Sequence, residues 1–341
     1  MSKKVLLTGV TGFLGSHTAI QLLNKGYRVT GTLRSLKRAD EIKPVIAHHT
    51  EAIDNLTLLE ADLLDAEVWK EATRGMDYVQ HIASPFPRML PRHEDELIIP
   101  AREGTLNVLK AAAANRVKRV VLTSSSGAII YGKEPDKRSG VFNEDHWTDP
   151  TNYQDTTPYF RSKVLAERAA WDFIEQDTSG MELATVCPGA ILGPVLEKDF
   201  GTSANIVIKN MDGSVPALPK IGFDIVDVRS VADLLMLAME KPEAANQRFV
   251  GSSGFMRFIE VANILRKAYP NKRIPRRELP HIAVRLFANI DKTLKPILND
   301  LGVKREVDHS KAVKLLGWKP INNEEAILSC AQSVIDIGLV K

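Results

Sequence analysis

Two apolar patterns alternate along residues 3–190 of the chain. Short, nearly continuous runs of Val, Leu and Ile are followed by longer segments in which apolar residues recur every three or four positions. The first pattern is typical of strands buried on both faces of a parallel sheet, and the second of helices that cover such a sheet. The sequence predicts strands at residues 4–8, 28–33, 56–61, 78–83, 119–124 and 182–187. Repeated strand–helix units of this kind indicate an α/β fold with a doubly wound parallel sheet.

The alternation loosens after Pro188, where Gly and Pro become frequent as far as residue 222. This composition is typical of loops over a cleft. A strand at 225–228, a helix at 231–240 and a strand at 248–250 are expected to return to the sheet, and the rest of the chain is mostly helical in pattern. We therefore predict a Rossmann-type domain from residues 1–188 plus about 223–252. Residues from about 189 to 222, plus 253–341, would form a smaller, mostly helical C-terminal lobe.

Composition narrows the class of protein without fixing its function. Hydrophobic residues make up 44% of the 341 residues and charged residues 26%, which is ordinary for a globular protein. The chain has no apolar run long enough to span a membrane, and we expect no membrane partner. The net charge is only +3, and the basic stretch at 266–277 lacks interleaved aromatic residues, so we expect no nucleic-acid partner.

Cysteine and histidine usage point to no metal site. The chain has only two cysteines, Cys187 and Cys330, and the pair His48 and His49 has no carboxylate or thiol at ligand spacing. A reducing compartment fits this usage. The short apolar run after the first lysines is broken at Thr8, and no cleavage site follows, so we expect a mature cytoplasmic protein.

The strongest local motif is VLLTGVTGFLG at residues 5–15, in which a strand is followed by three glycines and then a helix that runs to residue 25. Glycines in such a turn let the backbone approach a pyrophosphate, and the helix N-terminus offers free N–H groups to that anion. The motif therefore predicts a dinucleotide site. Its expected contacts are Gly9, Thr11, Gly12, Phe13, Leu14 and Gly15.

The second predicted strand indicates which dinucleotide is bound. NAD sites usually carry an acidic residue at the end of this strand, whereas here the strand leads into Arg34, with Lys37 and Arg38 close behind. A guanidinium suits a 2′-phosphate by charge and by its paired donors, so NADP(H) is the predicted cofactor. Further contacts are expected from residues that follow the third and fourth strands, namely Asp62, Leu63, Ala83 and Ser84.

A possible catalytic group lies on the predicted helix that begins near residue 157. Tyr159 and Lys163 are four residues apart and so lie on one face of this helix, where the ammonium could lower the tyrosine pKa. The preceding strand ends in the run Thr123 to Ser126, at the edge of a parallel sheet where ligands bind. One hydroxyl of this run could donate to a carbonyl oxygen. The serines alone could equally be turn formers. The serine run therefore indicates a catalytic site only in combination with Tyr159 and Lys163.

These motifs together resemble the extended short-chain dehydrogenase/reductase family, and within it the branch of dihydroflavonol, cinnamoyl-CoA and aldehyde/ketone reductases. The resemblance spans nearly the whole chain. It is carried by TGVTGFLGSH at 8–17, HIASPF at 81–86, GTLNVLKA at 104–111, RVVLTSSSGA at 119–128, YFRSKVLAE at 159–167, CPGAILGP at 187–194 and DIVDVRSVA at 224–232.

The resemblance implies a catalytic triad of Ser125, Tyr159 and Lys163, with Ser124 as the alternative serine. It also implies that Lys163 holds the nicotinamide ribose, that Pro188 lies beside the nicotinamide, and that Asn107 supports a proton relay. The expected reaction is the NADPH-dependent reduction of a carbonyl substrate, an aldehyde or ketone of apolar or aromatic character, to an alcohol. Tyr159 would act as general acid, and the smaller lobe would hold this small-molecule partner.

Alternatives remain at this stage. A nucleotide-sugar epimerase or dehydratase shares the glycine turn and the Tyr159–Lys163 pair, but commonly carries an acidic residue where this chain has Arg34. A hydroxysteroid dehydrogenase is closer to the proposed activity, and a non-catalytic NADP sensor would not need Tyr159 and Lys163. Ile130 stands where plant dihydroflavonol reductases have asparagine, which argues against a flavonoid substrate. Both a monomer and a homodimer fit the sequence.

Overall fold

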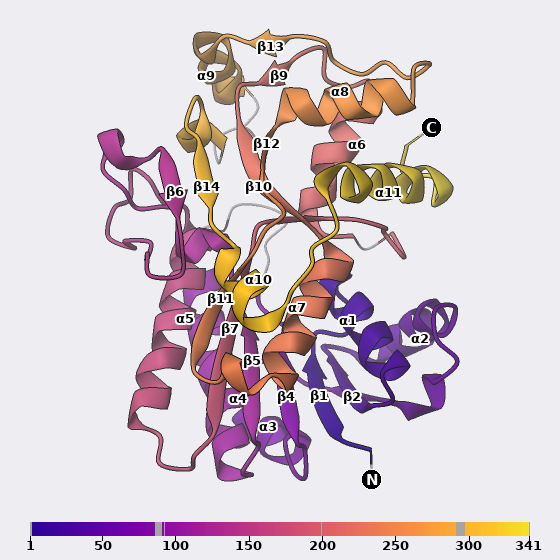
Figure 1. Ribbon diagram of the computed structural model, residues 1–341, viewed down its shortest axis with the longest axis vertical. Helices are drawn as coiled ribbons and strands as arrows, with labels where there is room; N and C mark the ends of the chain where they lie inside the picture. Colours follow the sequence, from indigo (N-terminus) through magenta and orange to yellow (C-terminus); the bar gives the residue numbers. More distant parts are fainter. Residues whose placement is uncertain (1, 86–90, 92, 199, 291–296, 341) are drawn as a thin grey trace.

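A parallel sheet of seven strands forms the centre of the fold in a computed structural model of the chain (Figure 1). The model describes residues 2–85, 91, 93–198, 200–290 and 297–340, so Phe86 of the HIASPF motif lies outside the described residues. The strand order is β3-β2-β1-β4-β5-β7-β11, and each neighbouring pair is parallel. The strands are β1 (Lys4–Thr8), β2 (Arg28–Leu33), β3 (Leu56–Glu60), β4 (Tyr78–His81), β5 (Arg119–Thr123), β7 (Glu182–Pro188) and β11 (Gln247–Gly251).

Helices cover both faces of this sheet, as the alternation of apolar residues along β1 requires. Val5 and Leu7 face one core cluster and Leu6 faces another, because successive side chains of a strand point to opposite faces. The helices of the first face are α1 (Phe13–Asn24), α2 (Ala39–Ala47) and α7 (Val228–Glu240). Those of the second face are α3 (Ala66–Ala72), α4 (Asp95–Ala114) and α5 (Pro158–Gln176). The Rossmann-type, doubly wound fold predicted from the sequence is confirmed.

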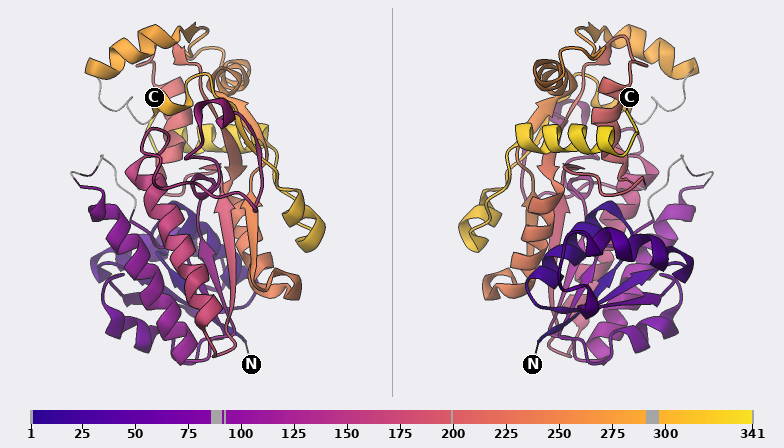
Figure 2. Two further views of the ribbon diagram at one scale, coloured as in Figure 1. Left: turned by 90° about the vertical axis from the view of Figure 1, so that its left-hand side faces the viewer. Right: turned by 90° about the vertical axis from the view of Figure 1, so that its right-hand side faces the viewer.

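A smaller lobe stands over the carboxyl ends of the central strands (Figures 1 and 2). Its core lies between helices α6 (Asn205–Met211), α8 (Phe258–Ala268) and α11 (Asn323–Asp336). Three small sheets accompany it, of which β12-β10-β8 has three strands and the other two pair β13 with β9 and β14 with β6. The remaining elements are β6 (Gly140–Phe142), β8 (Ala190–Leu192), β9 (Leu218–Pro219), β10 (Gly222–Asp227), β12 (Phe255–Arg257), β13 (Glu278–Leu279), α9 (His281–Ile290), β14 (Arg305–Val307) and α10 (Ser310–Leu316).

One strand predicted from the sequence belongs to a different sheet than expected. The strand expected at 225–228 corresponds to β10, but β10 pairs with β8 and β12 in the smaller sheet and does not join the central one. Its apolar run is that of any buried strand, and such a run does not specify its partner. The next two elements, α7 and β11, do return to the central sheet. The predicted division into two domains at the stated residues stays a prediction.

The fourth strand is shorter than predicted because a side chain at the end of β1 takes up two of its backbone N–H groups. The Thr8 hydroxyl oxygen accepts hydrogen bonds from the backbone N–H groups of Ile82 (3.0 Å) and Ala83 (2.9 Å). These N–H groups are thereby removed from the strand ladder, and β4 ends at His81. The chain then turns outward beside the glycine motif. In the part of the chain that the structure describes, no helix is both long enough and apolar enough to cross a membrane.

Candidate active site

The glycine turn after β1 is built for the close approach of a ligand. Gly9 has φ +74°, a left-handed conformation that glycine adopts without strain. A Cβ on Gly15 would lie 2.0 Å from the Gly9 carbonyl oxygen, so only glycine lets α1 start against this turn. Gly12 is the N-cap of α1 and offers no side-chain cap. The first N–H groups of the helix are therefore available to an anion, as a bound pyrophosphate requires.

The other residues predicted for this turn lie where the two lobes meet. Thr11 is half-buried in the turn, and Leu14 is buried in the core of the central domain. Phe13 opens α1 and packs against the core clusters of both lobes. His17, one turn later, forms a 2.8 Å hydrogen bond with the carbonyl oxygen of Pro194. The predicted cofactor turn is thus continuous with the smaller lobe.

The basic residues after β2 have different surroundings. Arg34 is exposed directly after the strand. Arg38, by contrast, forms ion pairs with Glu41 (3.1 Å) and with Glu197 of the smaller lobe (2.8 Å). Arg34 is therefore better placed than Arg38 to meet a ligand that arrives from solvent. Lys37, between them, is also exposed.

The two residues predicted after β3 form a polar turn at the same edge of the sheet. The carboxylate of Asp62 is exposed and accepts a 2.8 Å hydrogen bond from the N–H of Leu64. The carbonyl oxygen of Leu63 accepts a 3.0 Å hydrogen bond from the side-chain amide of Asn107 on α4. Asn107 thus supports the turn that carries Asp62. The proton-relay role suggested for Asn107 stays a prediction, as do the contacts of Asp62 and Leu63 with a cofactor.

The predicted triad comes together at the carboxyl ends of β4 and β5. Tyr159 and Lys163 lie on α5, which begins at Pro158 with the hydroxyl of Thr157 as its N-cap. Ser125 is the second residue after the end of β5 and forms a hydrogen bond with Tyr159. The Lys163 amine lies 5.9 Å from the centre of the Tyr159 ring. Three residues that are up to 38 positions apart in the sequence, 163 − 125, therefore share one site.

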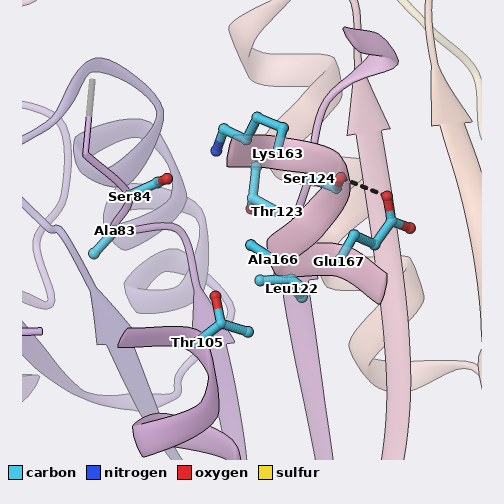
Figure 3. A pocket seen from close by; sticks show the side chains of 9 residues that line it. All are labelled: Ala83, Ser84, Thr105, Leu122, Thr123, Ser124, Lys163, Ala166 and Glu167. Atoms are coloured by element: carbon cyan, nitrogen blue, oxygen red, sulfur yellow. Dashed lines mark hydrogen bonds between the residues drawn. The ribbon is translucent and has the colours of Figure 1, made fainter. Parts of the chain in front are cut away.

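The structure distinguishes the two serines that the sequence left open. The Ser124 hydroxyl donates a 2.6 Å hydrogen bond to the buried carboxylate of Glu167 (Figure 3). The Ser125 oxygen instead accepts from the N–H of Gly127 (3.0 Å) and also meets Tyr159. Ser125 is thus the serine beside the tyrosine.

Burial dominates the acid–base behaviour of both catalytic candidates. It raises the pKa of Tyr159 to about 12, against the opposing effect of the hydrogen bond with Ser125. It lowers the pKa of Lys163 to about 8, while interactions with the Cys187 thiol and the Glu167 carboxylate act in the other direction. Burial thus raises the pKa of Tyr159 above its ordinary value, in place of the lowering that the sequence predicted. A phenol with this pKa stays protonated at neutral pH.

A small pocket lies next to Ser124 and Lys163, between the carboxyl ends of β4 and β5 (Figure 3). Its lining residues are Ala83, Ser84, Thr105, Leu122, Thr123, Ser124, Lys163, Ala166 and Glu167. Lys163 extends from α5 over this pocket toward the loop of Ala83 and Ser84 (Figure 3). The Thr123 hydroxyl is buried and has no hydrogen-bond partner among the described residues. A buried polar atom without a partner is uncommon, so this pocket is suited to a polar ligand group.

Pro188 is the last of the residues predicted to contact the cofactor. Pro188 is buried at the end of β7, where it pairs with Gly251 of β11. It lies at the same carboxyl edge as Ser125, which suits its predicted place beside a nicotinamide. Within the described ranges, no group of three or more His, Cys, Asp or Glu residues is arranged to hold a metal ion.

Sequence reasoning missed two charged residues next to this site. Glu167 ends the YFRSKVLAE motif and is buried, and Arg248 of β11 forms a 2.8 Å ion pair with it. A signal for Glu167 was present, because it lies four residues after Lys163 on the same face of α5. Arg248 gave no comparable signal, since it is far away in the sequence.

Comparison with known proteins assigns the family. A model of the NAD dependent epimerase/dehydratase family matches residues 5–250. The chain belongs to this family. The resemblance to extended short-chain dehydrogenases/reductases is thereby confirmed, and this family member is an NAD(P)-dependent oxidoreductase.

Curated relatives and solved structures of the family agree with this assignment. The chain is 35% identical over 341 residues to tetraketide alpha-pyrone reductase 1 of Arabidopsis thaliana, covering 98% of this chain and 96% of the relative. It is 33% identical over 277 residues to cinnamoyl-CoA reductase CAD2 of Medicago truncatula, covering 80% and 82%. The structure of yeast methylglyoxal/isovaleraldehyde reductase Gre2 complexed with NADPH superimposes with a TM-score of 0.80 at 28% identity, covering 99% of this chain and 100% of that one.

Proposed function

We propose that the protein uses NADPH to reduce an aldehyde or ketone of apolar or aromatic character to an alcohol. The observation that carries the proposal is the shared position of Tyr159, Ser125 and Lys163 beside a glycine turn with an uncapped helix. The relatives named above are reductases of carbonyl compounds, and one was crystallised with NADPH. When bound, the nicotinamide supplies the hydride.

The proton chemistry follows from the state of Tyr159. Its pKa of about 12 keeps the hydroxyl protonated at neutral pH, so it can donate a proton to a substrate oxygen as that oxygen gains negative charge. Ser125 can donate a second hydrogen bond to the same oxygen. Lys163, in its ammonium form, would stabilise the phenolate that Tyr159 leaves behind. This arrangement supplies the proton that carbonyl reduction requires.

The proposed apolar substrate rests on an apolar cluster that includes Phe160, the residue next to Tyr159. Ile130 is buried in a cluster with Tyr131, Phe142 and Val307, against which Phe160 packs. Phe160 stacks on Tyr131 with ring centres 3.7 Å apart and directly follows Tyr159. An apolar wall next to the general acid suits a substrate whose carbonyl carries an alkyl or aryl group.

Replacing Arg34 tests the choice of NADPH over NADH. Arg34→Ala should weaken NADPH binding by roughly tenfold or more while leaving NADH binding nearly unchanged, because only NADPH carries the 2′-phosphate. Fluorescence titration with each dinucleotide measures both affinities. Lys43→Ala is a matched control, since Lys43 is an exposed cation on the neighbouring helix α2. An equal loss for both dinucleotides would contradict the assignment of Arg34 to the phosphate.

Replacing each serine in turn tests which of them meets the substrate. Ser125→Ala should lower kcat/KM by about 10²-fold, because it removes a donor to the developing alkoxide. Ser124→Ala removes a hydrogen bond to Glu167 instead, and its effect on turnover should be clearly smaller. Steady-state kinetics with NADPH and one accepted carbonyl compound decide between them. The reverse order of effects would reassign the role to Ser124.

A further inference from the structure

One buried carboxylate joins helix α5 to three strands of the central sheet. Glu167 accepts hydrogen bonds from Ser124, which follows β5 (2.6 Å), from Thr185 of β7 (2.8 Å) and from Arg248 of β11 (2.8 Å). Its side chain is fully buried in this network. Figure 3 shows Glu167 one turn of α5 beyond Lys163, with Ser124 directed at it. The carboxylate therefore connects the helix that carries Lys163 to the segment after β5 that carries Ser124 and Ser125.

Arg248 keeps this carboxylate charged. The pKa of Glu167 stays below its usual value in spite of burial, first because of the Arg248 charge and then because of its hydrogen bonds. Arg248 is itself held in place, since its guanidinium lies 3.7 Å from the centre of the Trp147 ring and donates to the carbonyl oxygens of Glu144 and His146. An apolar pair could fill such a space with equal or better stability. The retained charge therefore suggests a role beyond packing.

Lys163 is the cation that this charge affects. Three titratable groups besides Glu167 lie near Lys163. His81 of β4 has a pKa lowered to about 3 by burial and by Lys163, so it is neutral. Burial raises the pKa of the Cys187 thiol on β7 far above the range in which Lys163 titrates, so Cys187 is neutral too. Tyr159 is also protonated in this range. Of these groups and Glu167, only Glu167 is an anion when Lys163 gains or loses its proton.

We propose that Glu167 is a positioning residue for the reaction, fixed by Arg248. Its carboxylate holds the Ser124 hydroxyl so that Ser125 faces Tyr159, and its charge keeps Lys163 in the ammonium form at neutral pH. The part that concerns Ser125 rests on the proposed function. The part that concerns Lys163 rests on the position of Glu167 one turn beyond Lys163 on α5 and on its buried charge, and it does not depend on the proposed function.

The test measures the titration of Lys163 without any turnover. The folded protein is exposed to trace acetic anhydride across a pH series, and mass spectrometry reports the acetylation of the Lys163 peptide. In the wild type, reactivity should reach half its maximum near pH 8. In Glu167→Gln this midpoint should fall by about one pH unit, because the ammonium loses its facing anion. The alkaline limit of kcat/KM should fall with it, and kcat should drop more than KM rises.

Two further variants keep the test decisive. Thr185→Val removes one hydrogen bond to Glu167 but leaves its charge, so the Lys163 midpoint should not move. If Glu167→Gln does not fold because Arg248 is left unpaired, Glu167→Gln with Arg248→Met replaces the pair by neutral side chains. Its midpoint should still lie below that of the wild type, because Glu167 is among the groups that raise the Lys163 pKa and Arg248 is not among those that lower it.

An unchanged Lys163 midpoint in a folded variant without Glu167 would overturn the proposal. A wild-type protein that reduces no carbonyl compound would overturn the proposed function instead. The acetylation result would still decide the effect of Glu167 on Lys163, so the two failures are distinguishable.

Discussion

Tyr159→Phe should lower the rate of NADPH-dependent carbonyl reduction by about 10²–10⁴-fold, which is the usual contribution of a positioned general acid. The variant loses the hydroxyl but keeps the ring, which packs edge-on to Phe160 with ring centres 5.7 Å apart. The fold and the affinity for NADPH should therefore stay close to those of the wild type. Single-turnover kinetics, together with NADPH fluorescence titration, separate the chemical step from binding.

Tyr153→Phe is the matched control for this variant. It makes the same chemical change at a tyrosine whose side chain is 64% exposed and whose hydroxyl donates to Glu94 at 3.3 Å. Its turnover should equal that of the wild type. If Tyr159→Phe kept more than about a tenth of wild-type turnover, the role of Tyr159 as general acid would be untenable.

Gly15→Ala should abolish tight NADPH binding and destabilise the protein by about 1–3 kcal/mol, as other overpacked sites do. The added Cβ would lie 2.0 Å from the Gly9 carbonyl oxygen and 3.1 Å from the Val10 Cα. These are backbone atoms, so the turn itself must move, and with it the N–H groups expected to meet the pyrophosphate. Fluorescence titration with NADPH and chemical denaturation measure the two effects.

Gly12→Ala separates the two effects of a methyl group in this turn. A Cβ there lies 3.4 Å from the Gly9 carbonyl oxygen, and φ is −79°, so the protein accommodates it. Stability should remain near that of the wild type, while NADPH binding weakens because the cofactor must approach the same space. Full NADPH affinity in Gly15→Ala would show that the turn does not bind the dinucleotide.

The sequence predicted elements well where the physical signal is local. β1, the glycine turn and α1 follow from apolar periodicity and from three glycines at the right place. The end of β4 did not follow, because it depends on the Thr8 hydroxyl, which captures two N–H groups of a segment 74 and 75 residues away. The sheet joined by β10 did not follow either. Pairing between strands depends on topology, which periodicity does not encode.

Prediction of the candidate site from the sequence has the same limit. The Tyr159–Lys163 pair lies on one helix face and was visible in the sequence, and the choice of Ser125 over Ser124 came only from the family resemblance. What separates Ser124 from Ser125 is the carboxylate of Glu167, and what holds that carboxylate is Arg248 on the last strand of the sheet. The raised pKa of Tyr159 was also unforeseen, because it is caused by burial. Such effects need the folded chain.

The most direct test of the central claim is the loss of NADPH absorbance with purified protein and a panel of aliphatic and aromatic aldehydes, ketones and a dihydroflavonol. The account predicts turnover with at least one apolar or aromatic carbonyl compound, faster with NADPH than with NADH, and formation of the corresponding alcohol. Silence across the panel, with NAD found tightly bound to the purified protein, would contradict it and favour an epimerase or dehydratase.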